Sequence, residues 1–189
     1  MEIIKNLIKD FAPKLNSEEV EQIISKFEIQ HIEKGKYLLK KKQICNYLSF
    51  VQSGCFKVFH VDEDKEVNVW FAFENMPITE MQSFINQKPS EYAIKALEMA
   101  EIISISYEEL NKLYETIPAF QLFGLRLTEK ILSKTIKRLT SFQFETAEKR
   151  YENLMTETNH VNRLSINDLS SYLGITPNSL SRIRSNRNK

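Results

Sequence analysis

The C-terminal end of the chain concentrates side chains that can hydrogen bond to nucleic-acid bases and phosphates. Asparagine and arginine carry paired groups that match base edges, whereas hydroxyl groups and further cations match phosphate oxygens. A helix that starts at Pro177 would present these side chains on its polar face. The candidate nucleic-acid contacts are Thr176, Asn178, Ser179, Ser181, Arg182, Arg184, Arg187 and Lys189.

The residues before this helix predict the turn that holds it. Gly174 suits a left-handed helix cap, Ile175 a buried plug, and Thr176 an N-cap directly before Pro177. A helix over Ile166–Leu173 precedes the turn, and two helices joined in this way are typical of a helix-turn-helix. Its small core is predicted from Leu169, Leu173, Ile175, Leu180 and Ile183. The alternative is an ordinary solvated and charged helix end.

The distribution of charge favours a nucleic-acid-binding tail. The 189 residues carry a formal net charge of +1, yet residues 1–117 hold 14 basic and 19 acidic side chains, and residues 118–189 hold 12 and 6. An acidic front and a basic tail are typical of a sensor joined to a nucleic-acid reader. An apolar content of 42% and a charged content of 27% indicate a globular chain and exclude a disordered one.

The front of the chain is predicted to be mostly β-structure. A helix is expected around Asn16–Phe27, and alternating apolar and polar residues then predict short strands at 28–32, 37–39, 47–52, 55–61, 65–73, 92–97 and 101–106. Strands at this spacing indicate an antiparallel β-sandwich or β-roll. Within the irregular segment 74–91, Thr79 and Gln82 have the spacing of a capped short helix. This segment either lines a ligand pocket or is a plain connection.

One long helix with two apolar faces is predicted from Pro118 to Phe142. Leu125, Leu132 and Leu139 repeat every seven residues on one face. The second face runs through Phe120, Phe123, Leu127 and Ile131. Because both faces must be buried, we expect one to lie on the β-roll and the other on a twin helix, which gives a dimer. The alternative is a helix enclosed within the core of one subunit.

In its order of parts the chain resembles the Crp/Fnr family of bacterial transcription regulators along nearly its whole length. The residues that carry the resemblance are Lys34-Gly35, Phe50-Val51-x-x-Gly54-x-x-Lys57-Val58, the segment Ile78–Ala96, and Leu169-Ser170-Ser171-Tyr172-Leu173-Gly174-Ile175-Thr176-Pro177-x-Ser179-Leu180-Ser181-Arg182.

The resemblance implies an α+β fold with three parts. Residues 1–116 would form an N-terminal antiparallel β-roll, a double-stranded β-helix of the cyclic-nucleotide-binding type. Residues 117–142 would form a long dimerisation helix, and residues 143–189 a helix-turn-helix domain. The implied partners are a second copy of the chain, palindromic double-stranded DNA and RNA polymerase. Two cysteines and the lack of an apolar leader or membrane span predict a cytoplasmic location and no membrane partner.

The same resemblance argues against the usual effector. Family members that bind cyclic nucleotides hold the ribose and phosphate with a Gly-Glu pair and, ten residues past the Glu, an Arg-Ser pair. The corresponding residues are Thr79-Glu80 and Ser90-Glu91, so Glu80 is retained, Ser90 replaces the cation that a phosphate needs, and the carboxylate of Glu91 follows it. We therefore expect no cyclic AMP or GMP binding in the usual manner, and the effector stays open. The candidate effector-pocket residues are Thr79, Glu80, Ser90, Glu91, Thr128 and Thr135.

The reader helix also departs from the family. The positions of the family's Arg-Glu pair and later Arg fall on Pro177, Asn178 and Arg182, so we expect a different operator, with Arg182 reading guanine and Asn178 adenine. Many relatives continue beyond the position of Lys189 into a β-hairpin wing. An incomplete wing implies fewer phosphate contacts and a modest affinity.

Other functions lack the residues that they need. An iron–sulfur cluster takes four cysteines, and the chain has Cys45 and Cys55 only. A metal enzyme of the cupin type needs clustered ligands, whereas His31, His60 and His160 are far apart in the sequence. We therefore expect no enzyme, no metal and no cofactor. The alternative function is a small-molecule sensor that acts through protein contacts, with weak or no DNA binding.

Overall fold

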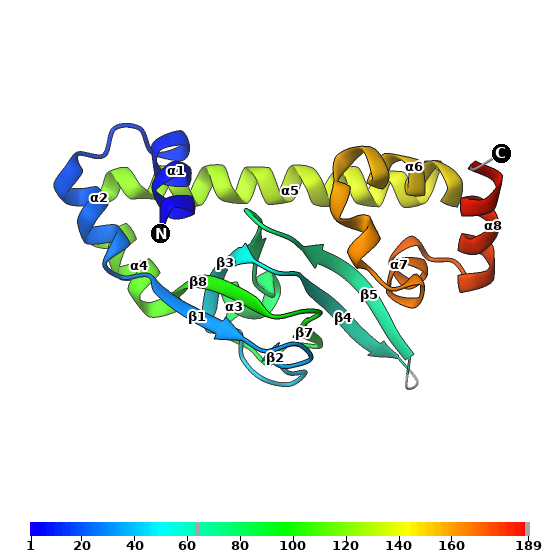
Figure 1. Ribbon diagram of the computed structural model, residues 1–189. Helices are drawn as coiled ribbons and strands as arrows, with labels where there is room; N and C mark the ends of the chain where they lie inside the picture. Colours follow the sequence, from blue (N-terminus) through cyan, green and yellow to red (C-terminus); the bar gives the residue numbers. More distant parts are fainter. Residues whose placement is uncertain (63–64, 188–189) are drawn as a thin grey trace. The chain divides into compact units, whose positions relative to one another are not determined.

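The computed structural model describes residues 1–62 and 65–187. These residues form an α+β fold with a long helix (Figure 1). In chain order the elements are α1 (Glu2–Phe11), α2 (Ser17–Ile24), β1 (Glu28–Ile32), β2 (Tyr37–Leu39), β3 (Tyr47–Ser53), β4 (Phe56–Asp62), β5 (Lys65–Ala72), β6 (Pro77–Ile78), α3 (Met81–Asn86), β7 (Tyr92–Ala96), β8 (Ala100–Ser106), α4 (Tyr107–Thr116), η1 (Pro118–Phe120), α5 (Gln121–Phe144), α6 (Ala147–Glu157), η2 (Asn159–Arg163), α7 (Ile166–Leu173) and α8 (Pro177–Arg187).

Within the described residues the strands make two four-stranded sheets, in the orders β1-β8-β3-β6 and β2-β7-β4-β5. In the first sheet β8 pairs antiparallel with both neighbours, so that Ile103 lies opposite Ile29 on one side and Phe50 on the other. Strands that are neighbours in sequence thus alternate between the two sheets, except β4 and β5, which lie side by side in the second sheet. The predicted antiparallel β-roll and the long helix are confirmed.

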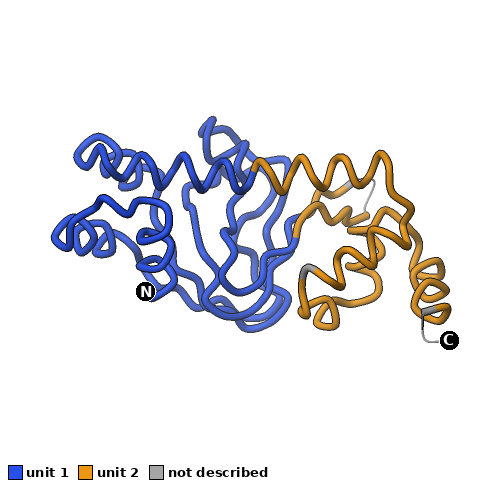
Figure 2. The backbone as a smooth tube through the Cα atoms, turned by 90° about the horizontal axis from the view of Figure 1, so that it is seen from above, with its two compact units in different colours: residues 1–58, 71–131 blue, residues 59–70, 132–189 orange. Residues whose placement is uncertain are grey.

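The chain divides into two compact units (Figure 2). Unit 1 comprises residues 1–58 and 71–131 and holds most of the β-roll. Unit 2 comprises residues 59–70 and 132–189. It therefore contains the end of β4 and the start of β5, the C-terminal part of α5, and α6, α7 and α8.

The core of unit 1 takes in the second apolar face of the long helix. Phe120 and Phe123 are fully buried and stacked, with ring centroids 4.9 Å apart, and Phe50 meets Phe123 edge-on at 6.5 Å. Leu127 is buried as well. The burial predicted for this face is confirmed for Phe120, Phe123 and Leu127, whereas Ile131 is only half-buried. The buried residues fix the N-terminal part of α5.

Two local predictions are wrong. The long helix begins with the 3-10 turn η1 at Pro118, and α5 itself starts at Gln121. The N-cap of α3 is Glu80 and not Thr79, because strand β6 (Pro77–Ile78) pairs with β3 just before it. The Thr79 hydroxyl instead donates a hydrogen bond to the Tyr47 carbonyl, at 3.0 Å.

Candidate nucleic-acid interface

Hydroxyl side chains start the helices that follow α5. Thr146, Ser165 and Thr176 each accept a hydrogen bond from the backbone N–H three residues further on, at 3.2, 3.0 and 3.2 Å. Such a cap satisfies a backbone donor that the helix itself leaves unpaired. The predicted Thr176 cap is confirmed, and it sets where α8 begins.

The turn between α7 and α8 requires glycine for two reasons. Gly174 has φ 69° and ψ 34°, the left-handed conformation that side chains with a Cβ adopt reluctantly. The turn closes with a 3.0 Å hydrogen bond from the Ile175 N–H to the Ser170 carbonyl. A Cβ at Gly174 would also lie only 3.1 Å from Cε1 of Phe142. The predicted left-handed cap is confirmed, and its close approach to α5 is a further finding.

Two guanidinium groups hold the Phe142 ring beside this turn. Arg150 lies over the ring with its Cζ 4.6 Å from the centroid, and Arg138 with its Cζ at 5.3 Å. Arg150 also donates to the Glu145 carbonyl at 2.7 Å and to the Leu173 carbonyl at 2.9 Å. It therefore ties the last residue of α7 to the corner between α5 and α6.

Arg138 makes a second set of contacts with α7. Its guanidinium stacks on the Tyr172 ring, 3.8 Å from the centroid, and donates to the Tyr172 carbonyl at 3.3 Å. Burial lowers the pKa of Arg138, while the interaction with Tyr172 opposes that shift. The group stays cationic because the pKa of arginine starts so high. Sequence analysis missed both arginines, because their partners lie 23 to 34 residues away along the chain.

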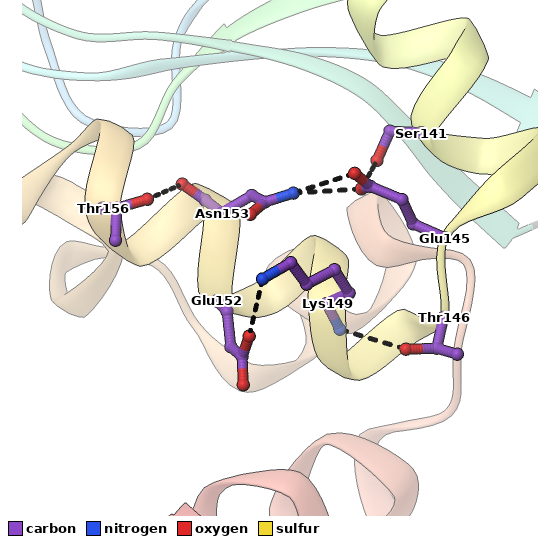
Figure 3. Close-up of polar contacts among 7 residues, drawn as sticks. All are labelled: Ser141, Glu145, Thr146, Lys149, Glu152, Asn153 and Thr156. Atoms are coloured by element: carbon purple, nitrogen blue, oxygen red, sulfur yellow. Dashed lines mark hydrogen bonds and ion pairs between the residues drawn. The ribbon is translucent and has the colours of Figure 1, made fainter.

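The corner between α5 and α6 has its own polar lock (Figure 3). The Glu145 carboxylate accepts hydrogen bonds from the Ser141 hydroxyl and from the Asn153 amide, the latter at 3.1 Å to each oxygen. One turn away, Lys149 pairs with Glu152 at 3.3 Å on the exposed side of α6. The Glu145 contacts fix the direction in which α6 leaves α5, whereas the exposed pair adds little.

The core around α7 and α8 is smaller on the α8 side than predicted. Leu169, Leu173 and Leu180 are buried as expected. Ile175 and Ile183 are only half-buried, so the prediction of Ile175 as a buried plug is wrong. The remaining core comes from Tyr151, Val161 and Leu164, which the sequence analysis did not include. These residues precede α7 in the chain.

The outer face of α8 is open. Thr176, Asn178, Ser181 and Arg182 are all exposed. The Ser181 hydroxyl donates to the Pro177 carbonyl at 3.0 Å. Within the described part of the chain, the Asn178 amide and the Arg182 guanidinium make no hydrogen bond or ion pair. Both groups are thus available to a ligand.

The other predicted contacts differ in their surroundings. Ser179 is half-buried, and its hydroxyl lies 3.0 Å from that of Thr176. Arg184 is half-buried, with its Cζ 5.8 Å above the Tyr151 ring. Arg187 ends α8, and Lys189 lies outside the described residues. Arg184 therefore packs against α6, and Asn178 and Arg182 are the better candidates for reading bases.

Glu80 and Ser90, two predicted effector residues, are buried in unit 1 and bonded within it. The Glu80 side chain is 8% exposed, and its carboxylate accepts the backbone N–H groups of Gln82 at 3.1 Å and Ser83 at 2.9 Å. The Ser90 hydroxyl both accepts from and donates to the Tyr92 backbone, at 3.0 Å each way. These groups already have partners from their own chain.

The remaining effector candidates do not share one location. Thr79 lies next to Glu80, and its hydroxyl is 3.3 Å from the Cys45 sulfur. Glu91 is exposed and pairs with Lys41 at 3.5 Å. Thr128 and Thr135 are exposed on α5, where the Thr128 hydroxyl donates to the Gly124 carbonyl at 2.8 Å. Thr79, Glu80, Ser90, Glu91 and Thr128 thus belong to unit 1, and Thr135 to unit 2.

The predicted dimerisation leucines form an exposed stripe along α5. Leu125, Leu132 and Leu139 are 54, 55 and 60% exposed. Ile136, which the sequence analysis did not include, is 55% exposed. Its place four residues after Leu132 and three before Leu139 makes it part of the same stripe. An apolar stripe of this kind on one helix is typical of an interaction surface.

Other kinds of site lack residues in the described part of the chain. Residues 1–62 and 65–187 contain no group of three or more His, Cys, Asp or Glu side chains placed to hold a metal ion. None of their helices is long and apolar enough to cross a membrane. Cys45 and Cys55 are both buried, and neither forms a disulfide within the described residues.

Comparison with known proteins identifies the β-roll. Residues 29–117 match the model of the cyclic nucleotide-binding domain family. No curated protein sequence matches the chain. The α6, α7 and α8 helices lie outside the matched range.

Solved structures share the fold at low sequence identity. A CooA mutant from Carboxydothermus hydrogenoformans is 18% identical with a TM-score of 0.69, over 93% of this chain and 83% of that one. FixK2 from Bradyrhizobium japonicum is 15% identical with a TM-score of 0.73, over 85% and 83%. The c-di-GMP responsive global regulator CLP from Xanthomonas campestris is 16% identical with a TM-score of 0.67, over 92% of each chain. The chain therefore has the fold of these proteins.

Two arginines of unit 2 should differ sharply in their effect on stability. Arg150→Met removes charged hydrogen bonds to two carbonyl groups and a contact with Phe142, so we expect the free energy of unfolding to fall by about 2–3 kcal/mol. The matched change Arg182→Met, on the open face of α8, should leave stability unchanged. Urea unfolding of the full chain, followed by circular dichroism, measures both. Equal losses would contradict the role given to Arg150.

Proposed function

We propose that this protein is a homodimeric transcription regulator that binds palindromic DNA in the cytoplasm through a C-terminal helix-turn-helix. In this proposal residues 1–116 are the sensor β-roll, residues 117–142 the dimerisation helix and residues 143–189 the DNA-binding domain. The observation that carries it is the open face of α8, on a helix whose start and direction are fixed by Thr176 and Gly174. A helix held at its N-terminus by such a turn is suited to the major groove.

The chemistry of α8 supports base reading. Asn178 and Arg182 are four residues apart, so their side chains lie on the same face of the helix. An amide can pair with the adenine edge and a guanidinium with the guanine edge. The Thr176 hydroxyl, exposed at the helix start, is placed to meet a phosphate together with the positive end of the helix dipole.

The exposed stripe on α5 supports the homodimer. Leu125, Leu132, Ile136 and Leu139 leave a continuous apolar surface on a helix whose other face is already buried in unit 1. A second copy of the same helix offers a matching surface, and a two-fold axis between two such helices would give two α8 helices related by symmetry. Symmetric readers call for a palindromic site.

The contacts around α3 support a sensor that does not take a cyclic nucleotide in the usual manner, although residues 29–117 match that domain family. The Glu80 carboxylate accepts hydrogen bonds from the backbone N–H groups of Gln82 and Ser83 at the start of α3, so it already has partners from its own chain. Ser90 stands where an arginine would be expected, and its hydroxyl is held by Tyr92. A phosphate would therefore meet a carboxylate and find no cation beside it.

Selection from a random duplex library tests DNA recognition. The purified protein should enrich a palindromic sequence, and Arg182→Ala should lose about 10- to 100-fold in discrimination against a changed base, since a bidentate base contact is worth roughly 1–3 kcal/mol. Lys189→Ala, which removes only a cation, should weaken all sequences alike. Failure to enrich any sequence would favour a sensor that acts through protein contacts instead.

A charge on the α5 stripe should separate the dimer. Leu132→Glu removes apolar contact from both copies and opposes two carboxylates, so we expect the dissociation constant of the dimer to rise about 100-fold or more. Lys134→Glu puts the same carboxylate on an exposed position of the same helix that is not three or four residues from any member of the stripe, and serves as the control. Sedimentation equilibrium reports both. A monomeric wild type, or equal effects of the two changes, would overturn the assignment.

Titration calorimetry with cyclic AMP and cyclic GMP tests the sensor assignment. We expect no binding at millimolar nucleotide, because Ser90 supplies no cation for the phosphate and Glu91 adds a carboxylate next to it in the chain. Ser90→Arg supplies that cation and serves as a comparison in which weak binding is expected. Micromolar binding by the wild type would show that the missing arginine is replaced by other groups.

A further inference from the structure

Strand β5 is hydrogen bonded to α7 within unit 2. The Ser171 hydroxyl accepts a hydrogen bond from the Asn68 N–H at 2.9 Å and donates one to the Glu66 carbonyl at 3.0 Å. Because β5 is the last strand in the order β2-β7-β4-β5, these two backbone groups face away from the sheet. The Ser171 side chain thus takes the place of a neighbouring strand.

The Asn68 side chain adds a second pair of hydrogen bonds. Its amide nitrogen donates to the Asp168 carbonyl at 3.0 Å and to the Asp168 carboxylate at 3.1 Å. Asn68 is only 3% exposed. The contact made by Glu66, Asn68, Asp168 and Ser171 is called the β5–α7 clasp below.

The clasp is not fully satisfied. The Asn68 Oδ1 atom is buried and has no hydrogen-bond partner within the described residues. A buried acceptor without a donor makes a folded arrangement less favourable, because the same atom would be hydrated if the contact opened. The other bonds of the clasp are polar, and water can replace each of them when β5 and α7 separate. We therefore expect the free energy needed to open the clasp to be small.

Arg138 joins the same two elements from the side of α5. Its guanidinium donates to the Val69 carbonyl of β5 and, at 3.3 Å, to the Tyr172 carbonyl of α7. The end of α5 is thus in contact with both partners of the clasp. A movement of Arg138 would therefore change its hydrogen bonds to β5 and to α7 at the same time.

The clasp lies beside the surface proposed to meet DNA. The start of β5 and the turn before α8 line one groove of about 740 Å³, whose walls include Lys65, Val67, Asp168, Thr176 and Pro177. In helix-turn-helix proteins the first helix crosses the phosphate backbone while the second enters the major groove. A duplex seated on α8 would therefore bring its backbone to α7, where β5 now lies. Glu66 is exposed there, and in the sequence Lys65 separates it from the three acidic residues 62–64.

We propose that the β5–α7 clasp is autoinhibitory: it holds β5, with the exposed Glu66, against the first helix of the helix-turn-helix, and DNA binding requires the clasp to open. This inference rests on the proposed function. Two consequences follow from it. Weakening the clasp tightens DNA binding, because a larger fraction of the protein is competent to bind. DNA binding in turn exposes the clasped backbone groups.

Two variants of the full chain test the clasp, one from each side. Asn68→Ala removes both bonds to Asp168, and Ser171→Ala removes the bonds to the β5 backbone. Asn111→Ala, which removes a 2.8 Å bond from an asparagine side chain to the Tyr107 carbonyl in unit 1, is the matched control. The measurements are the dissociation constant for the selected palindromic duplex and the rate of hydrogen exchange at the Asn68 amide, followed by NMR.

We expect both clasp variants to bind the duplex about five- to tenfold more tightly than the wild type, and Asn111→Ala to bind with unchanged affinity. Exchange at the Asn68 amide should become about tenfold faster in Ser171→Ala, and also in the wild type once DNA is bound. Unchanged exchange in Ser171→Ala would show that the clasp does not exist in solution.

Faster exchange with unchanged or weaker DNA binding would overturn autoinhibition while leaving the DNA-binding function intact. If neither the wild type nor any variant binds duplex DNA, the proposed function fails and the autoinhibitory role fails with it. Because the exchange measurement needs no DNA, it separates an absent clasp from an absent function.

Discussion

The contact of the Phe142 ring with the turn at Gly174 decides where α8 points. Apart from Leu180, the described side chains of α8 are half-buried or exposed, so this helix has little packing of its own with which to choose a direction. The turn supplies the direction, and it depends on a glycine in the left-handed conformation with an aromatic edge 3.1 Å from where a Cβ would be. Arg150 holds the ring and the last carbonyl of α7 at the same time. The open face of α8 is therefore set by the end of α5.

Helix α5 has two apolar faces, of which one is buried and the other is exposed. Phe123 and Leu127 are buried in unit 1, whereas Leu132 and Ile136 are more than half exposed. The same helix then continues to Arg138 and Phe142, which contact the turn and α7. In the proposed dimer, a shift of one α5 helix relative to its twin would also move Arg138 and Phe142. It would therefore displace the turn that sets the direction of α8.

The buried polar groups of the two units differ in how well they are satisfied. The Glu80 carboxylate, at the start of α3, and the Ser90 hydroxyl each make two hydrogen bonds within their own chain. These polar groups therefore need no ligand to satisfy them. At β5 the Asn68 side chain donates twice but leaves its oxygen without a partner in the described residues. Satisfied networks rigidify a structure, while incomplete ones mark where it can open. The clasp is therefore a second candidate for regulation, in addition to the β-roll.

Interactions between residues close in sequence determine much of the local structure of this protein. The Thr176 cap, the Gly174 turn, the strand positions and the buried face of α5 all follow from spacing over a few residues, because caps, turns and periodicity are local physics. Tertiary structure decided the rest. It made Glu80 the cap of α3, since β6 pairs with β3 just before it. It left Ile175 half-buried, and it brought Arg138, Arg150 and Asn68 to partners 23 to 100 residues away. Hydrogen bonds between such distant groups have no periodicity, and only the folded chain determines them.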